Sequence, residues 1–522
     1  MALSEKDVDH QSHEEDHHVS PSEEQDEAHL RPPPPSGAGD LESGSTTSPG
    51  GGDEKPPDPN IIGWDGPTDP ENPMNWKTSK KILNVGLVSF MCFLTPLASS
   101  MFAPAVPTVM AEFHSNNLEM ASFIVSVFVL GFAFGPVLLG PLSEVWGRLY
   151  LYWICNILFV VFTAVCAKSN SIGMLTGFRF LCGFVGGLPL AVGGGTITDM
   201  MSQDNRGAAM ALFSAGPLLG PIIGPVAGGF LSEAKGWRWV FWLLTIASGV
   251  CTIAIILFMR ESYAPTILAQ KVRRLKKQTG NQDLRPMNDR QMPIGTLLKH
   301  SLLRPAKLLM FSPIVLGLST FMAFCFGCMY LLFTTFTTVY QEVYGWGTGL
   351  DGLSFIGMGV GSIAAMLIFG LTSDRILRTL AAKNGGDMKP EYRLVLLIPG
   401  SFCIPVGLFW YGWAAQAHTH WIVPILGTVF VGLGFLATMV TITSYLLDAY
   451  TEFSASAVAA SAVARSIVGS CLPLAGRQMY DSMGYGWGNS LLGFICVAMI
   501  PIPFLFYRYG EGLRKKFPVN LK

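Results

Sequence analysis

Long apolar runs separated by short polar segments dominate the chain. A helix needs about 20 mostly apolar residues to cross a bilayer. Twelve runs reach that length, at about residues 82–105, 120–140, 149–167, 174–199, 208–231, 238–259, 312–338, 352–372, 394–415, 422–446, 456–476 and 488–507. The pattern therefore predicts an all-α membrane protein with twelve transmembrane helices.

The runs fall into two groups of six, separated by a basic central loop at residues 260–311. The second run ends in Gly140-Pro-Leu-Ser-Glu-Val-Trp-Gly-Arg148, and the eighth ends in Gly370-Leu-Thr-Ser-Asp-Arg-Ile-Leu-Arg378. Both segments read Gly-x-x-Ser-acid followed by Arg four residues later, so the two halves repeat each other. We expect two pseudo-symmetric six-helix bundles, at 82–259 and 312–507, with a substrate site between them near the bilayer midplane.

Polar segments flank these bundles. Residues 1–60 are acidic and rich in Pro, Ser and Gly, which predicts a disordered cytosolic tail. Residues 61–81 form an amphipathic pre-membrane segment, and residues 508–522 form a basic cytosolic tail. Within the central loop, residues 271–277 are expected to form an amphipathic helix at the membrane surface.

Lys and Arg concentrate in the segments on one side of the predicted helices. This bias predicts that both termini are cytosolic. We expect the plasma membrane, with the vacuolar membrane as the alternative. Charged residues make up only 14% of the chain, and no basic face suggests nucleic acid. All ten cysteines lie in apolar segments and no Asn-x-Ser/Thr sequon occurs, so we expect no disulfide framework, no metal site and no N-glycosylation.

The fifth run carries a four-residue repeat. Its glycines are Gly216, Gly220, Gly224 and Gly228, and its prolines are Pro217, Pro221 and Pro225. Small residues let another helix approach closely, and a bilayer tolerates proline within a helix. We expect a stiff, kinked helix that acts as a hinge or seal. An ordinary glycine-rich packing helix is the alternative.

Several stretches resemble the major facilitator superfamily, and within it the fungal twelve-spanner drug:proton antiporters. The segment from Gly140 to Arg148 resembles the family's Gly-x-Leu-Ala-Asp-Arg-x-Gly-Arg motif, with Glu144 in place of Asp. Arg179-Phe-Leu-Cys-Gly-Phe-Val-Gly-Gly187 resembles the Arg-x-x-x-Gly motif, and the glycine–proline repeat resembles the Gly-Pro-x-x-Gly antiporter motif. Glu261-Ser-Tyr-Ala-Pro265 resembles fungal members. The resemblance implies the major facilitator fold. It also implies transport that is driven by a proton gradient and needs no bound cofactor.

Two arginines, Arg179 and Arg465, lie inside predicted membrane helices. A charge within the bilayer is costly and usually marks a functional site. The resemblance makes Arg179 a cavity arginine that takes part in proton coupling. A structural arginine paired with backbone carbonyls is the alternative. For Arg465, cavity lining and structural pairing stay equally open.

The resemblance also implies a conformational latch at the cytosolic ends of the helices. Its residues are Gly140, Glu144, Gly147, Arg148, Asp199, Asp374 and Asp448. In the family, an acid at the position of Asp199 pairs with the arginine at Arg148, and the carboxylate at Glu144 can face a helix N-terminus. Together these residues would latch the outward-facing state. A solvated rim is the alternative.

The seventh run carries four aromatic residues: Tyr330, Phe333, Phe336 and Tyr340. An aromatic cavity would suit flat, apolar or cationic substrates through stacking and cation–π contact. Packing or lipid-facing rings are the alternative. Gly347-Thr-Gly-Leu-Asp-Gly352 has the spacing of a dinucleotide-binding loop, but it joins two membrane helices and follows no strand, so we do not expect a nucleotide there.

These features predict a transporter rather than an enzyme, since no nucleophile–base or metal constellation occurs. We expect a monomeric, proton-driven exporter of small, largely apolar organic molecules such as drugs, fungicides or self-made toxins. A polyamine or other organic-cation exporter and a nutrient importer are the alternatives of the same fold. A membrane sensor that binds its ligand without moving it is the alternative from another class.

Overall fold

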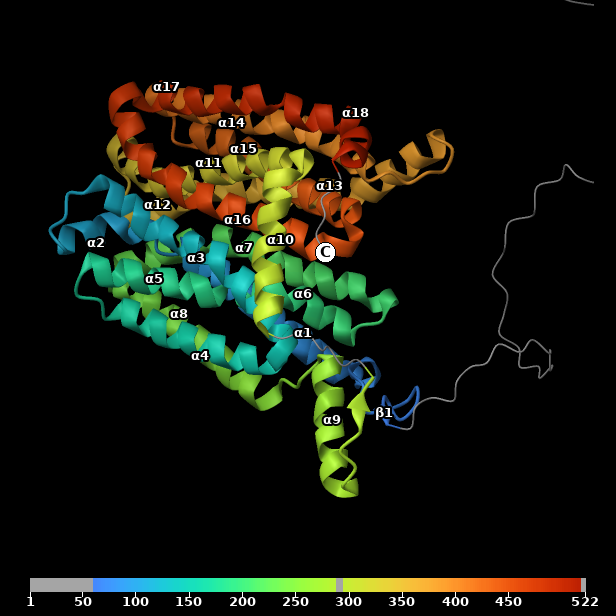
Figure 1. The fold of residues 1–522 in the computed structure, drawn as a ribbon. Helices are drawn as coiled ribbons and strands as arrows, with labels where there is room; N and C mark the ends of the chain where they lie inside the picture. Colours follow the sequence, from blue (N-terminus) through green and yellow to red (C-terminus); the bar gives the residue numbers. More distant parts are fainter. Residues whose placement is uncertain (1–59, 288–293, 518–522) are drawn as a thin grey trace, which may run out of the picture. The chain divides into compact units, whose positions relative to one another are not determined.

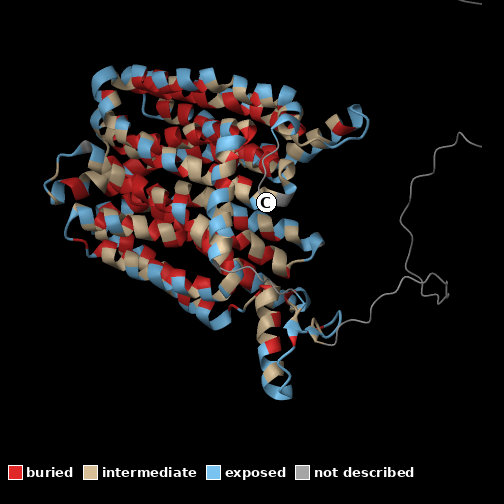
Figure 2. Cartoon of the chain, viewed as in Figure 1, coloured by how far each residue is buried: buried red, intermediate tan, exposed pale blue. Residues whose placement is uncertain are grey.

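The computed structural model describes residues 60–287 and 294–517. The predicted acidic tail lies outside these residues, apart from Asn60, and so do residues 518–522 of the predicted basic tail. The described chain consists mainly of long helices that run side by side (Figure 1). Buried residues lie where helices face one another, and exposed residues line the outer faces of the bundle (Figure 2).

The N-terminal half contains six helical spans. They are α1 (Thr78–Ser100), α3 (Leu118–Trp146), α4 (Arg148–Ala167), the pair α5 (Ile172–Gly186) and α6 (Leu188–Met200), α7 (Gln203–Lys235) and α8 (Arg238–Phe258). Beyond α1 the chain continues through the short helices η2 (Ala103–Ala105) and α2 (Val106–Glu112).

The C-terminal half follows the central loop. Its helices are α11 (Pro313–Tyr344), α12 (Thr348–Asp351) with η3 (Gly352–Phe355) and α13 (Ile356–Lys383), η4 (Pro390–Leu396) with α14 (Leu397–Gln416), α15 (Ile422–Ala449), α16 (Ser454–Cys471), α17 (Gly476–Met499) and α18 (Pro501–Lys516). The loop itself contributes α9 (Ala264–Thr279) and α10 (Ile294–Phe311), and α10 packs against helices of both halves, α3 and α16.

The last helical stretch contains two spans. The described residues hold 11 continuous stretches that are long and apolar enough to cross a membrane, and one of them, Ser454–Lys516, has 63 residues. Within it Gly484 leaves the helical conformation, with φ 74° and ψ 171°. The Tyr480 hydroxyl lies 3.1 Å from the side-chain oxygen of Asn489, although nine residues of straight helix would rise about 13 Å. The chain therefore folds back at Gly484, which gives twelve spans and confirms the predicted fold class.

The two halves repeat one packing pattern. In the N-terminal half the most extensive contacts join α1 to α7, α3 to α5 and α4 to α8. In the C-terminal half the corresponding helices are also extensively packed, α11 with α16, α13 with α15 and α14 with α17, and α14 packs equally closely against α15. This correspondence is the structural form of the repeat that the two Gly-x-x-Ser-acid segments predicted.

The bundle has two chemically different ends. We call the end that carries β1 (Ile61–Ile62) and α9 the basic end, and the end that carries α2 and α12 the far end (Figure 1). By their positions in the chain, Arg148 at the start of α4 and Arg393 in η4 belong to the basic end, and Gly484 between the last two spans belongs to the far end. Because the spans alternate in direction, the segments that connect consecutive spans also alternate between these two ends.

The most extensive contacts between the halves lie in two places. One is the contact of α3 with α16, where the Ser126 hydroxyl donates a hydrogen bond of 2.9 Å to the carbonyl of Ser470. The other is the contact of α7 with α12, η3 and α13. There the backbones touch at the far end, because a Cβ atom at Gly229 would lie 2.7 Å from the carbonyl oxygen of Thr348, and one at Gly352 would lie 2.5 Å from that of Pro225.

The glycine repeat of α7 packs within its own half. Cβ atoms at Gly216 and Gly220 would lie 2.8 Å and 2.7 Å from the backbone nitrogens of Phe93 and Leu97 on α1. Gly224 and Gly228 likewise face α1, at Ser100 and Met101. The helix stays continuous through Pro217, Pro221 and Pro225. The glycines of the repeat thus fix the distance between α1 and α7, whereas Gly229, one residue beyond them, faces the other half.

This packing predicts a position-specific effect of added methyl groups. Gly228→Ala would push a Cβ atom into the carbonyl of Met101, so we expect a loss of roughly 1–3 kcal/mol of stability. Gly249→Ala on α8 is the matched control, because no atom lies within 4 Å of its added Cβ. Thermal melting of the purified protein measures both variants. Equal melting temperatures would show that α7 does not depend on this contact.

Candidate functional site

Arg179 is enclosed by the N-terminal half. Its side chain, 1% exposed, projects from α5 and donates hydrogen bonds to three backbone carbonyls: Ile124 at 2.6 Å, Ser99 at 3.0 Å and Val125 at 3.4 Å. The rings of Phe102, Phe128 and Phe241 surround the guanidinium at 4.9 Å, 5.5 Å and 5.9 Å. This is the geometry of the structural alternative, in which backbone oxygens of α1 and α3 offset the buried charge.

A polar contact between the halves lies directly beside Arg179. The Ser99 hydroxyl and the Tyr330 hydroxyl, from α1 and α11, are 3.2 Å apart. Behind Tyr330 its neighbour Phe326 lies 5.0 Å away, ring to ring, and the guanidinium of Arg465 stands 5.6 Å from the Phe326 ring. The two interior arginines therefore flank one aromatic pair at the interface between the halves.

Arg465 differs from Arg179 in its surroundings. It is half-buried in the middle of α16, and among the described residues no carboxylate forms an ion pair with it. Its guanidinium lies against the Phe326 ring and interacts electrostatically with Tyr330. A guanidinium with unused donors can receive a polar or anionic group of a bound molecule. We call Ser99, Phe326, Tyr330 and Arg465 the central site.

The four aromatic residues predicted for the cavity separate into two groups. Tyr330 lies at the interface, and Phe333 packs next to it at a ring distance of 5.4 Å. Phe336 and Tyr340 are fully buried in the C-terminal half, where Phe336 contacts Phe355 and Tyr411 and Tyr340 contacts Trp346. In this conformation the packing alternative describes these two residues. The sequence interpretation missed Phe326, which precedes Tyr330 by one helical turn.

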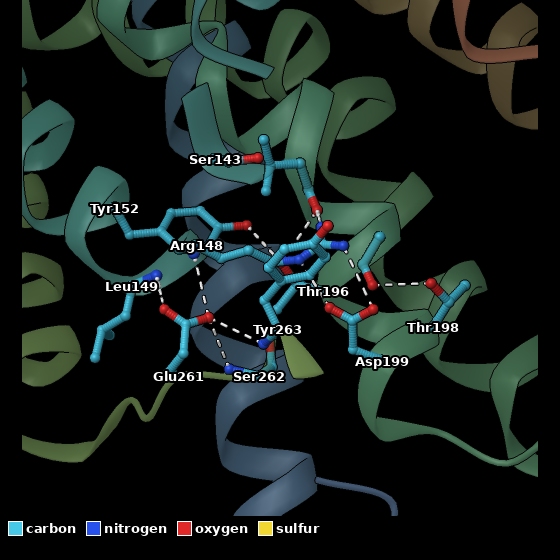
Figure 3. Close-up of polar contacts among 12 residues, drawn as sticks. Ser143, Arg148, Leu149, Tyr152, Thr196, Thr198, Asp199, Glu261, Ser262 and Tyr263 are labelled. Atoms are coloured by element: carbon cyan, nitrogen blue, oxygen red, sulfur yellow. Dashed lines mark hydrogen bonds and ion pairs between the residues drawn. The ribbon is translucent and has the colours of Figure 1, made fainter. Parts of the chain in front are cut away.

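At the basic end, Arg148 and Asp199 form the predicted pair (Figure 3). The Arg148 Nε atom lies 2.7 Å from Asp199 Oδ2, and its Nη1 donates to the carbonyl of Val192 at 3.0 Å. The guanidinium also rests against Gly195 and faces the ring of Tyr263 at 5.3 Å. The pair joins the start of α4 to the end of α6, so both partners belong to the N-terminal half.

A second carboxylate, from Glu261, caps α4. It accepts hydrogen bonds from the backbone N–H groups of Arg148 at 3.2 Å and Leu149 at 3.0 Å (Figure 3). A negative charge at a helix N-terminus is stabilised by the helix dipole. A carboxylate at a helix N-terminus was the expectation for Glu144, which stays a prediction; on α4 this role belongs to Glu261. The Glu261–Pro265 segment was recognised in the sequence as a motif. Its position in the sequence did not indicate that Glu261 would bind the N-terminus of α4.

Gly147 makes this capping contact possible. Its φ of 91° is unfavourable for residues with a side chain, and a Cβ there would lie 2.5 Å from the Glu261 carboxylate. Gly140 has open space around it, and its carbonyl accepts a 2.6 Å hydrogen bond from Ser143. Glu144 is exposed in the last turn of α3.

The C-terminal half repeats the pair with different residues. Arg393 in η4 binds Asp448 at the end of α15, as Arg148 binds Asp199, and its Nη1 lies 3.5 Å from Asp374 on α13. The sequence separations are similar, 51 residues for the first pair and 55 for the second. Asp448 was singled out from the sequence, whereas its partner Arg393, which lies beyond the repeated segment Gly370 to Arg378, was missed. In this conformation each pair closes within its own half and does not join the halves.

The pre-membrane segment and the central loop form one unit. Ile61–Ile62 (β1) pairs in parallel with Arg285–Pro286 (β2), and Lys271 of α9 binds Asp65 at 2.7 Å and Asp69 at 3.4 Å. The backbone N–H of Asp65 lowers the pKa of Asp69 below its ordinary value, and Lys271 acts in the same direction. Part of the basic face predicted for the membrane surface is thus bound by acidic residues of the chain itself.

The fold and the central site define a membrane transporter with two repeated halves. The chain belongs to the Major Facilitator Superfamily, whose family model matches residues 88–473. This confirms the resemblance seen in its motifs.

Named relatives cover most of the chain. The MFS-type transporter tndD of Aspergillus flavipes is 53% identical over 464 residues, which is 88% of this chain and 86% of the relative. The efflux pump radE of Floropilus chiversii is 49% identical over 471 residues, which is 90% of this chain and 88% of the relative. The xylose transporter XylE from E. coli, in a partially occluded inward open conformation, has a TM-score of 0.61 at 17% identity, covers 83% of this chain and 98% of its own, and shows the fold alone.

The partly buried Arg148–Asp199 pair should show strong coupling in a double-mutant cycle. Removing one partner leaves the other charge partly buried without its counter-ion, so Arg148→Met and Asp199→Asn together should cost less stability than the sum of the two, by roughly 1–3 kcal/mol. The more exposed Arg477–Asp481 pair is the control, and its coupling should stay within about 0.5 kcal/mol. Additive losses at the first pair would contradict a role in holding α4 against α6.

Proposed function

We propose that this protein is a proton-coupled exporter of small, largely apolar organic compounds that carry a polar or anionic group. The central site is the observation that supports this most strongly. It lies at the interface between the two halves, and it combines aromatic surface from Phe326 and Tyr330 with the half-buried guanidinium of Arg465. Aromatic rings bind apolar bodies, and the guanidinium selects the polar group.

Two further observations support export. The relative from Floropilus chiversii is named an efflux pump. The glycine–proline repeat of α7 matches the antiporter motif, and it fixes α7 against α1 next to the contact with α12. The charges near the central site, Arg179 and Arg465, are both positive, which disfavours polyamines and other organic cations.

We assign the basic end to the cytosol, because Lys and Arg concentrate there. On this assignment the halves are closed toward the outside, where α7 meets α12, and the described conformation would receive substrate from the cytosol. Transport would follow from rocking of the halves about the central site, with protons entering as substrate leaves. We propose that the protein acts as a monomer in the plasma membrane.

The direction of transport is tested in cells of a drug-sensitive host. Expression should lower the accumulation of a fluorescent hydrophobic organic acid by several-fold, because export removes it from the cytosol. A protonophore should abolish the difference. Increased uptake of the probe, or export that persists without a proton gradient, would contradict the proposal.

Variants separate the roles of the two interior arginines. Arg465→Gln should reduce export at least tenfold at unchanged protein abundance, because it removes the charge from the central site without opening a buried carbonyl network. Arg179→Lys should instead lower abundance and melting temperature, because an ammonium cannot bind three carbonyls on α1 and α3 in the same geometry. Arg477→Gln, at the far end beyond α16, is the control. Normal export per molecule in Arg465→Gln would show that Arg465 does not contribute to substrate binding at the central site.

A further inference from the structure

A carboxylate is buried where the halves meet at the far end. Asp351, the last residue of α12, is fully buried. Its Oδ2 atom accepts a hydrogen bond of 2.5 Å from the side-chain amide of Gln341 on α11. Its Oδ1 atom is equally buried and has no hydrogen-bond partner. Among the described residues no Lys, Arg or His forms an ion pair with Asp351.

A second carboxylate approaches from the other half. Glu233 on α7 lies within electrostatic range of Asp351. Its carboxylate sits against the backbone of α12, since a Cβ at Gly347 would lie 3.2 Å from Glu233 Oε1, and one at Gly349 would clash with Oε2. The two acids thus lie on the two sides of the contact that closes the far end.

Among the described residues of the elements packed against α12, no positive charge is paired with Asp351, and Lys235, two residues beyond Glu233 on α7, is exposed. From α11, Glu342 is already bound by Arg477 at 2.7 Å and Tyr485 at 2.6 Å. The residues of η2 and η3, which also pack against α12, carry no titratable side chain. Burying an ionised carboxylate without a cation, next to another carboxylate, is strongly unfavourable. A protonated carboxyl avoids this cost, and its unpartnered oxygen can hold the proton.

We propose that Asp351 is a proton-binding site of the far end, and that its occupancy sets whether the halves close there. When the far end is open, the carboxylate takes a proton from water on that side, and the neutral acid can be buried beneath Glu233. When the acid ionises again, the buried charge and its repulsion from Glu233 drive the halves apart. The role of this site in transport rests on the proposed function. In a proton-coupled exporter, external protons would close the far end after substrate has left.

Thermodynamic linkage fixes the sign of the pH dependence. The closed far end binds the proton more tightly than the open one, so closure is fully favoured at acidic pH. It is lost as the pH rises and Asp351 ionises. Asp351→Asn keeps the size and the hydrogen bond to Gln341 but cannot ionise. It should therefore stay closed at every pH.

Distances between spin labels in the full chain, reconstituted in lipid nanodiscs, test this. Labels at Lys168→Cys and Ala417→Cys, both exposed at the far end of different halves, report its closure once Cys403 and Cys471, the two cysteines that are not buried, are replaced by serine. As pH rises, the population with the shorter distance between the two labels should decrease and the population with the longer distance should increase. In Asp351→Asn the ratio of closed to open protein should be at least tenfold higher at alkaline pH, and constant.

Two further variants sharpen the result. Glu233→Gln should reduce the difference in the closed-to-open ratio between acidic and alkaline pH, because without the repelling charge the closed state binds the proton less tightly. Glu119→Gln, an exposed acid at the same end, should titrate like the parent protein. A parental pH dependence in Asp351→Asn, or distances that do not change with pH in the parent, would overturn the proposal. The measurement needs no substrate and no gradient, so a failure of proton-driven export would leave its outcome readable.

Discussion

Close approach of helix backbones at glycine is the contact on which the rest of this structure depends. Lipid offers helices no hydrophobic reason to associate, so they must be held by packing at short range. Gly131, Gly135 and Gly183 bring α3 and α5 together, and Gly357, Gly361 and Gly432 do the same for the corresponding pair α13 and α15. The α1–α7 contact adds the four-residue repeat of α7. Each half is therefore a tightly joined body, whereas the halves share fewer such contacts.

The interior charges fall into two groups, those bound within one half and those at the interface between the halves. Arg179 is offset by backbone carbonyls, and Arg148 and Arg393 are offset by carboxylates of their own half. These charges hold a half together. Arg465 and Asp351 lie where the halves face each other, and neither has an ionic partner among the described residues. A charge without a partner at a moving interface is available to bind a substrate or a proton, which is why the functional proposals rest on these two residues.

The sequence predicted the twelve spans well, because the length and polarity limits of a bilayer act on each run separately. It also predicted the Arg148–Asp199 pair, since a motif fixed both partners. Contacts between distant segments were harder to predict. Nothing in the spacing of Glu261 shows that it caps α4, and the partners of Arg179 are backbone atoms that leave no mark in the sequence.

The segment Gly347–Gly352 illustrates the limit most clearly. Its glycines were considered only as a nucleotide-binding pattern and were set aside. In the structure they give α7 the space to reach α12, and the acid between them is buried at that contact. The expected latch shows the opposite case, since Arg148 and Asp199 pair as the resemblance implies but within one half. Pairing within a half or between halves depends on the conformation, which a single sequence does not specify.

The central claim is that two rigid halves move against each other about the central site. Four label pairs in one experiment test it most directly: one pair across the halves at each end, and one pair within each half. The account predicts that the far-end distance lengthens as the basic-end distance shortens, while both distances within the halves stay constant. Changes within a half, or two ends that open together, would contradict it.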